Sequence, residues 1–82
     1  MAFRREDTAT KVISIVEEKL GRSSGTVQES DSFESLGADS LDLVELIMTF
    51  EEEFGIIIKD EDVERLKTMS AVIDYVQTAR TK

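Results

Sequence analysis

Helical spacing of apolar residues between Ser40 and Phe54 limits the folds open to this chain more than any other pattern in it. At about 100° per residue, one helix face collects the side chains of Leu43, Leu46, Ile47, Phe50 and Phe54. More than about 90° away on the same helix lie Leu41, Val44 and Met48, flanked by Glu45, Glu51 and Glu52. The first face predicts a core contact. The second predicts either packing beneath another helix or an exposed docking surface with an acidic rim.

Ser40 at the start of this helix is the candidate functional residue. Asp39 is a suitable N-cap, because its carboxylate can accept a backbone N–H two or three residues on. Gly37 allows a tight turn before it, so the sequence predicts an exposed hydroxyl on a firm base. A catalytic serine needs a base to take its proton, and the chain has no histidine, no cysteine and no G-x-S-x-G pattern. Unaided, Ser40 should be inert, and the simplest interpretation is a helix-start residue.

Several strings around Ser40 resemble the acyl carrier protein family. They are Leu36-Gly37-Ala38-Asp39-Ser40-Leu41-Asp42, Val44-Glu45-Leu46, Glu51-Glu52-Glu53-Phe54, Asp60-Glu61-Asp62 and Ala71-Val72-Ile73-Asp74-Tyr75-Val76. The resemblance implies that Ser40, in the Asp39-Ser40-Leu41 motif, carries phosphopantetheine, installed from coenzyme A by a carrier-protein phosphopantetheinyl transferase. It also implies a carrier and not an enzyme, one that holds growing acyl chains as thioesters in fatty acid biosynthesis.

The acidic charge of the chain is concentrated around Ser40. Residues 29–64 hold thirteen acids and one base, Lys59, for a net charge of −12, whereas the rest of the chain holds nine bases and five acids. Such a field repels nucleic acid and attracts basic protein surfaces. We therefore expect docking to fatty acid synthesis enzymes and acyltransferases with basic surfaces. The expected contact residues are Leu41, Asp42, Val44, Glu45, Met48, Glu51 and Glu52.

The whole chain reads as one small helical domain. We expect helices over about Asp7–Leu20, Ser40–Phe54, Glu61–Leu66 and Met69–Thr78. The first should be capped by Asp7 and ended by Gly21, the third capped by Asp60 and the fourth by Thr68. The expected fold is an all-α four-helix bundle, three longer helices and one short helix, with an ordered core over about residues 7–78. A long loop from Arg22 to Ser35 should be pinned by Val27 and Phe33, and Ile56–Ile58 should be loop with at least one side chain in the core.

Two positions depart from the pattern of the family that the chain resembles. The segment from Phe33 to Leu36 is one residue shorter than usual, and Lys59 stands where proline is usual, so we expect a more mobile connection there. The acids after Lys59 alternate like a calcium loop, but Arg65 occupies the position that requires glycine, so no metal site is expected.

The apolar core should also shelter the acyl cargo, because apolar cavities readily take apolar guests. Its expected lining is Leu43, Leu46, Ile47, Phe50, Phe54, Ile58, Leu66 and Val72. The chain is expected to be a monomer that does not cross a membrane and is cytoplasmic, although an organelle protein freed of its transit peptide would look the same. Alternatives are a polyketide, aminoacyl or specialised lipid carrier and, from another class, an unmodified acidic adaptor or calcium-responsive protein.

Overall fold

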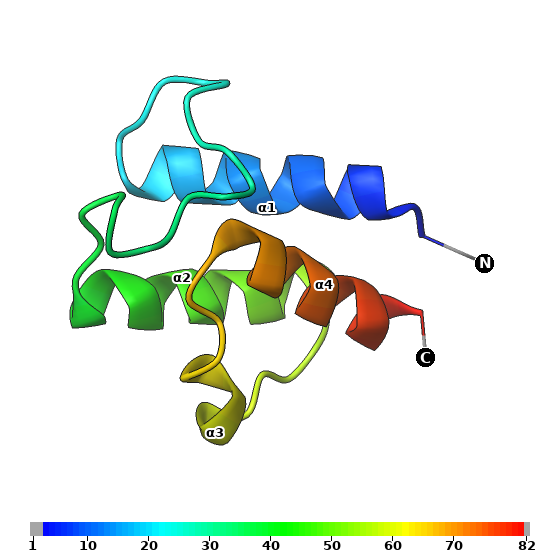
Figure 1. The fold of residues 1–82 in the computed structure, drawn as a ribbon. Helices are drawn as coiled ribbons and strands as arrows, with labels where there is room; N and C mark the ends of the chain where they lie inside the picture. Colours follow the sequence, from blue (N-terminus) through cyan, green and yellow to red (C-terminus); the bar gives the residue numbers. More distant parts are fainter. Residues whose placement is uncertain (1–2, 82) are drawn as a thin grey trace.

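A computed structural model describes residues 3–81 of the chain, and four helices account for most of them. These are α1 (Arg5–Lys19), α2 (Ser40–Phe54), α3 (Asp60–Val63) and α4 (Met69–Arg80). In Figure 1, α1 and α2 run in opposite directions, α4 packs across them, and α3 hangs below on the connection between α2 and α4. Within residues 3–81 the only β-type pairing is an isolated bridge between Ser32 and Thr68. The expected all-α bundle with three longer helices and one short helix is confirmed.

The first helix begins two residues before the predicted start. Its N-cap is Arg4, which makes no side-chain capping bond, and Asp7 lies within the first turn. The predicted cap at Asp7 was therefore wrong. Tertiary contacts explain the extra residues, because the Arg5 guanidinium pairs with Glu29 in the long loop and with Asp74 in α4. The helix ends at Lys19, as the glycine at position 21 (φ 66°) led us to expect to within a residue.

The two C-terminal helices also differ at their ends from the prediction. The short helix starts at Asp60 with Lys59 as its N-cap, so Asp60 does not cap it, and it stops at Val63. Beyond Val63 the chain continues in tighter i to i−3 hydrogen bonds, from Arg65 to Asp62 and from Leu66 to Val63. Thr68 does cap α4, accepting from the Ala71 N–H at 3.1 Å. That helix runs on to Arg80, two residues past its predicted end.

Apolar side chains from all the longer helices and from the loops form one core. Leu46 and Phe50 of α2 are fully buried, and Val27 and Phe33 pin the long loop as predicted. Of the three consecutive isoleucines only Ile58 is buried. The buried apolar set is Ala9, Val12, Val16, Val27, Phe33, Leu36, Leu46, Ile47, Phe50, Ile58, Leu66, Met69, Val72, Ile73 and Val76.

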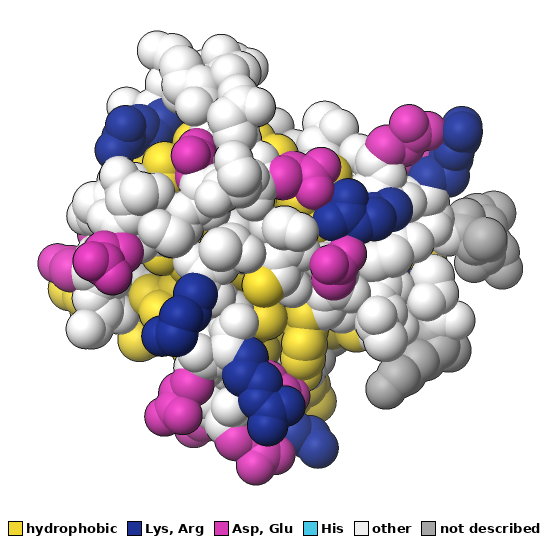
Figure 2. Space-filling model, in the orientation of Figure 1, with side chains coloured by type: hydrophobic (Ala, Val, Ile, Leu, Met, Phe, Trp, Pro, Cys, Tyr) yellow, Lys and Arg dark blue, Asp and Glu magenta, His cyan; other side chains and the backbone are white. Residues whose placement is uncertain are grey.

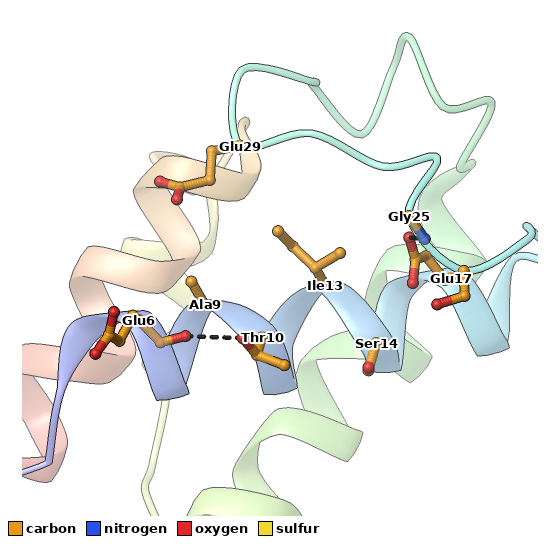
Figure 3. A pocket seen from close by; sticks show the side chains of 9 residues that line it. Glu6, Ala9, Thr10, Ile13, Ser14, Glu17, Gly25 and Glu29 are labelled. Carbon is orange, nitrogen blue, oxygen red and sulfur yellow. Dashed lines mark hydrogen bonds between the residues drawn. The ribbon is translucent and has the colours of Figure 1, made fainter.

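The long loop between α1 and α2 is held at two places. Near its start, the buried carboxylate of Glu17 accepts the backbone N–H groups of Gly25 at 2.8 Å and Val27 at 3.2 Å. Figure 3 shows Glu17 reaching from α1 to Gly25, at the edge of a groove of about 400 Å³ between α1 and the loop. Further on, the Phe33 N–H donates to the Lys67 carbonyl at 3.0 Å, which ties the loop to the start of α4. These bonds fix the position of the loop that leads into α2.

Candidate functional site

Ser40 is the first residue of α2 and is exposed to solvent, as predicted. Asp39 and Asp42 form a reciprocal capping box: the Asp42 N–H donates to the Asp39 carboxylate at 2.9 Å, and the Asp39 N–H donates to the Asp42 carboxylate at 3.2 Å. Gly37 has φ 78°, which turns the chain into the helix. Among residues 3–81, no side chain hydrogen-bonds to Ser40 Oγ. The hydroxyl is thus free, and the backbone that carries it is fixed.

The surroundings of Ser40 suit an attached anion better than they suit catalysis by the chain itself. The positive end of the α2 dipole lies at this hydroxyl, and it favours a phosphate group. No general base contacts the hydroxyl within the described part of the chain. Within that part, no cluster of acidic side chains has the geometry of a metal site either. The site can therefore offer a nucleophile to a partner that brings its own base.

The second apolar face of α2 is uncovered. The exposed fractions of Leu41, Val44 and Met48 are 67%, 55% and 54%. Packing beneath another helix is thereby excluded for the described residues, and these three side chains, which we call the α2 stripe, face solvent beside Ser40. Surface acids lie around α3 as well, with Lys and Arg side chains between them, on the face drawn in Figure 2.

The acids around the α2 stripe differ in what they contact. Glu45 and Glu52 are exposed, as a docking rim requires. Glu51 is half-buried, and its carboxylate accepts the Ile58 N–H at 2.8 Å, so it fastens the connection between α2 and α3. Asp42 is likewise engaged in the capping box. Two of the predicted docking acids therefore have structural contacts of their own.

Two grooves follow the α2–α3 boundary, and both are lined by Leu43 and Val63. One has a volume of about 610 Å³, opens at Ser40 and is also lined by Leu66. The other, of about 320 Å³, runs past Ile47 and Met48. Val63 was not among the residues predicted to line the acyl pocket, although it is the one apolar residue of α3 and stands three positions before Leu66.

The predicted acyl pocket is a filled core in this structure. Leu46, Phe50 and Val72 have no exposed surface, and Ile47, Ile58 and Leu66 are nearly as deeply buried. Leu43 and Phe54 are half-buried at its edge. The structure thus brings these side chains together, but of this set only Leu43 and Leu66 line the groove beside Ser40.

No helix in the described part of the chain has both the length and the apolar character that crossing a membrane would require. This agrees with the absence of a long apolar run in the sequence.

Comparison with known proteins points to one family throughout. The family model described as a phosphopantetheine attachment site matches residues 10–76, a range that includes Ser40. The acyl carrier protein of Trieres chinensis is 46% identical over 78 residues, covering 94% of this chain and 98% of that protein. The acyl carrier protein of Zymomonas mobilis is 48% identical over 71 residues, covering 85% and 91%.

Solved structures give the same answer. The crystal structure of the Thermotoga maritima acyl carrier protein superposes with a TM-score of 0.78 at 36% identity, covering 92% of this chain and 88% of that one. The acyl carrier protein of Enterococcus faecalis superposes with a TM-score of 0.78 at 31% identity, covering 94% and 99%.

Proposed function

The chain belongs to the acyl carrier protein family, and from that premise we propose that it carries growing acyl chains as thioesters on a phosphopantetheine arm at Ser40 in fatty acid biosynthesis. The family model that it matches is the phosphopantetheine attachment site, so phosphopantetheine is its cofactor. The observation that carries the assignment to Ser40 is the free, exposed hydroxyl at the first position of a firmly capped helix. When bound, the arm supplies a thiol that holds the acyl group in reactive form.

Attachment requires a phosphoryl-type transfer to Ser40. Ser40 Oγ bonds to the phosphorus that bears the pantetheine group of coenzyme A, the bond from that phosphorus to the bridging oxygen breaks, and the nucleotide bisphosphate leaves. The serine proton goes to a base of the transferase, because no side chain of residues 3–81 bonds to this hydroxyl. The α2 N-terminus then stabilises the negative charge of the resulting phosphodiester. The chain supplies the nucleophile and its position, and the transferase supplies the catalysis, which is consistent with a carrier that is not itself an enzyme.

The α2 stripe and its exposed acids are the proposed docking surface for the transferase, for fatty acid synthesis enzymes and for acyltransferases. Apolar side chains that stay uncovered beside carboxylates fit a partner surface with apolar sites and basic residues around them. Glu45 and Glu52 carry the charge of this surface, while Asp42 and Glu51 chiefly hold its shape.

For the acyl cargo we propose the groove that opens at Ser40 as the first shelter. Its lining includes Leu43, Val63 and Leu66, so a chain attached through the arm meets apolar surface without displacing the fully buried core. Deeper entry, among Leu46 and Phe50, requires those side chains to move.

The test is the intact mass of the protein after incubation with coenzyme A and a carrier-protein phosphopantetheinyl transferase. The unaltered chain should gain one phosphopantetheine, and Ser40→Ala should gain none while keeping its helical circular dichroism. Ser30→Ala, an exposed serine in the long loop, is the matched control and should be loaded normally. No gain by the unaltered chain, under conditions that modify a known carrier, would instead indicate an unmodified acidic adaptor.

The pathway needs a second measurement on the loaded protein. Acceptance of malonyl and saturated acyl groups from fatty acid synthesis enzymes supports the proposed pathway. Rejection of these groups, with acceptance of aminoacyl or polyketide units, would move the chain to one of the other carrier types.

A further inference from the structure

Arg22 makes a contact that links the end of α1 to the segment before Ser40. Its Nη2 donates to the Leu36 carbonyl oxygen at 2.7 Å, across fourteen residues of sequence. Leu36 stands four positions before Ser40, and its own side chain is buried in the core. In Figure 1 the segment leading into α2 lies beside the C-terminal end of α1, where Arg22 follows the helix.

This contact is the one hydrogen bond in the described part of the chain that joins residues 36–40 to anything outside residues 32–44. The other bonds of the segment are local. The Ala38 N–H donates to the Phe33 carbonyl, the Gly37 N–H to Glu34, and the capping box closes on Asp42. Without Arg22, the segment would still be tied to the rest of the protein by the Phe33 N–H bond to Lys67, by the helix that it enters and by apolar packing, but among the described residues no hydrogen bond would join it to the end of α1.

Arg22 is itself held in place. Its backbone N–H donates to the Glu17 carbonyl at 2.7 Å, next to Gly21 in the left-handed conformation, which is the bond that closes a Schellman motif. The Glu17 side chain is buried and binds the backbone of Gly25 and Val27. The guanidinium therefore extends from a fixed point on the bundle, and a charge-assisted bond from such a point restrains its acceptor well.

The turn before the segment closes on itself through the side chains of Ser32 and Ser35. The Ser32 N–H donates to Ser35 Oγ at 3.0 Å, and the Ser35 N–H donates to Ser32 Oγ at 2.9 Å. These bonds set the shape of the turn but not its position against α1.

We propose that Arg22 is a positioning residue that holds the 36–40 segment, and through it the Ser40 hydroxyl, for phosphopantetheine transfer. The proposal rests on the attachment of phosphopantetheine at Ser40 argued above. The Arg22 side chain bonds to the Leu36 carbonyl and not to the Ser40 hydroxyl, so its removal should reduce how often a docked carrier presents Ser40 correctly while leaving docking itself intact. Misplacement of a reacting group affects the rate of the chemical step more than binding.

The experiment compares Arg22→Met, Arg22→Lys and the control Lys19→Met, which removes one positive charge from the same end of α1 without removing a hydrogen bond. Initial rates of transfer from coenzyme A are measured against carrier concentration. Arg22→Met should lower kcat by about five- to tenfold with little change in KM. Arg22→Lys, which can still donate one bond, should recover part of the loss, and Lys19→Met should behave like the unaltered chain.

Amide hydrogen exchange on the same proteins, without the arm, gives an independent readout. Exchange at Gly37, Ala38 and Asp39 should accelerate in Arg22→Met, while exchange at buried Val72 of α4 should not. Should Arg22→Met fail to fold, Arg22→Lys carries both measurements against Lys19→Met, and slower transfer with faster local exchange is again expected.

Three results would overturn the assignment: an unchanged kcat, an equal loss in Lys19→Met, or exchange that accelerates equally throughout the bundle. Failure of the unaltered chain to accept phosphopantetheine would count against the function at Ser40, and the exchange data would still decide whether Arg22 restrains the segment.

Discussion

The glutamates of α2 have different roles in this protein, and their positions along the helix do not show which role each one has. On a helical wheel Glu45, Glu51 and Glu52 all flank the α2 stripe. In the structure, Glu51 binds the Ile58 N–H, whereas the other two are exposed. Periodicity could not anticipate this, because the donor belongs to an irregular connection whose path depends on tertiary packing. The cap at Asp39 was predictable, since both partners of the box lie within three residues.

The Tyr75 hydroxyl on α4 should make the stability of the fold depend on pH in the alkaline range. Burial, and then the hydrogen bond that it donates to Asp62 at 2.9 Å, raise the pKa of Tyr75 above its usual value. Stability from the neutral phenol is therefore fully present below the unfolded pKa of about 10 and is lost as the pH rises through the higher folded value.

Tyr75→Phe measures this contribution directly. The melting temperature of the unaltered protein should exceed that of Tyr75→Phe by a constant margin up to about pH 9, and the margin should shrink above about pH 10. Lysines titrate in the same range but are common to both proteins, so their effect cancels in the difference. A margin that stays constant to pH 11 would mean that the pKa of Tyr75 is the same in the folded and unfolded states.

At the scale of the helices, the sequence predicted which segments are helical better than the residues at which each helix begins and ends. The range predicted for α2 matches the observed one, because the N-cap Asp39 and the C-cap Gly55 mark its two limits locally. The limits of α1 and α4 depend on contacts between them. Arg5 pairs with Asp74, and the Arg80 guanidinium stacks 3.8 Å from the centroid of the Phe3 ring. Such contacts join residues about seventy positions apart, which no local signal can report.

The α2 helix should behave as the electrostatic docking element. The double variant Glu45→Lys/Glu52→Lys should raise KM for the transferase by about tenfold at low salt, and the difference should shrink as salt screens the charges. Its control is Glu18→Lys/Glu53→Lys, with the same change in net charge at exposed positions outside the proposed surface. Transfer kinetics against sodium chloride concentration make the comparison. Equal effects of the two double variants would show that only net charge matters, and the acidic rim would then be no more than a solubilising surface.

At the scale of the whole molecule, the uneven charge is scarcely neutralised within the fold. Three ion pairs occur among residues 3–81, and only the pair from Arg5 to Glu29 involves an acid of the −12 segment. Mutual repulsion among the remaining carboxylates opposes the compact state, and a chain of this length has a small core to offset it.

Added ions should therefore stabilise the protein. The melting temperature should rise with sodium chloride, and magnesium chloride at matched ionic strength should give a similar rise, because the described residues form no acidic cluster with metal-binding geometry. Calorimetry or circular dichroism in the two salts makes the measurement. A clearly larger rise with magnesium would reveal bridging of carboxylates, and no rise in either salt would show that the clustered charge does not govern stability.

The stacking of Arg80 on Phe3 bears on where a tag, a support or another domain can be joined to the protein without blocking Ser40. The same guanidinium lies 5.0 Å from the ring of Phe54, the last residue of α2, so both ends of the described chain meet where that helix stops. Ser40 is at the other end of its fifteen residues, about 22 Å away along the axis. A tag, a solid support or a linker to a neighbouring domain would therefore be joined near the end of α2 opposite Ser40, which should leave the approach to the serine open.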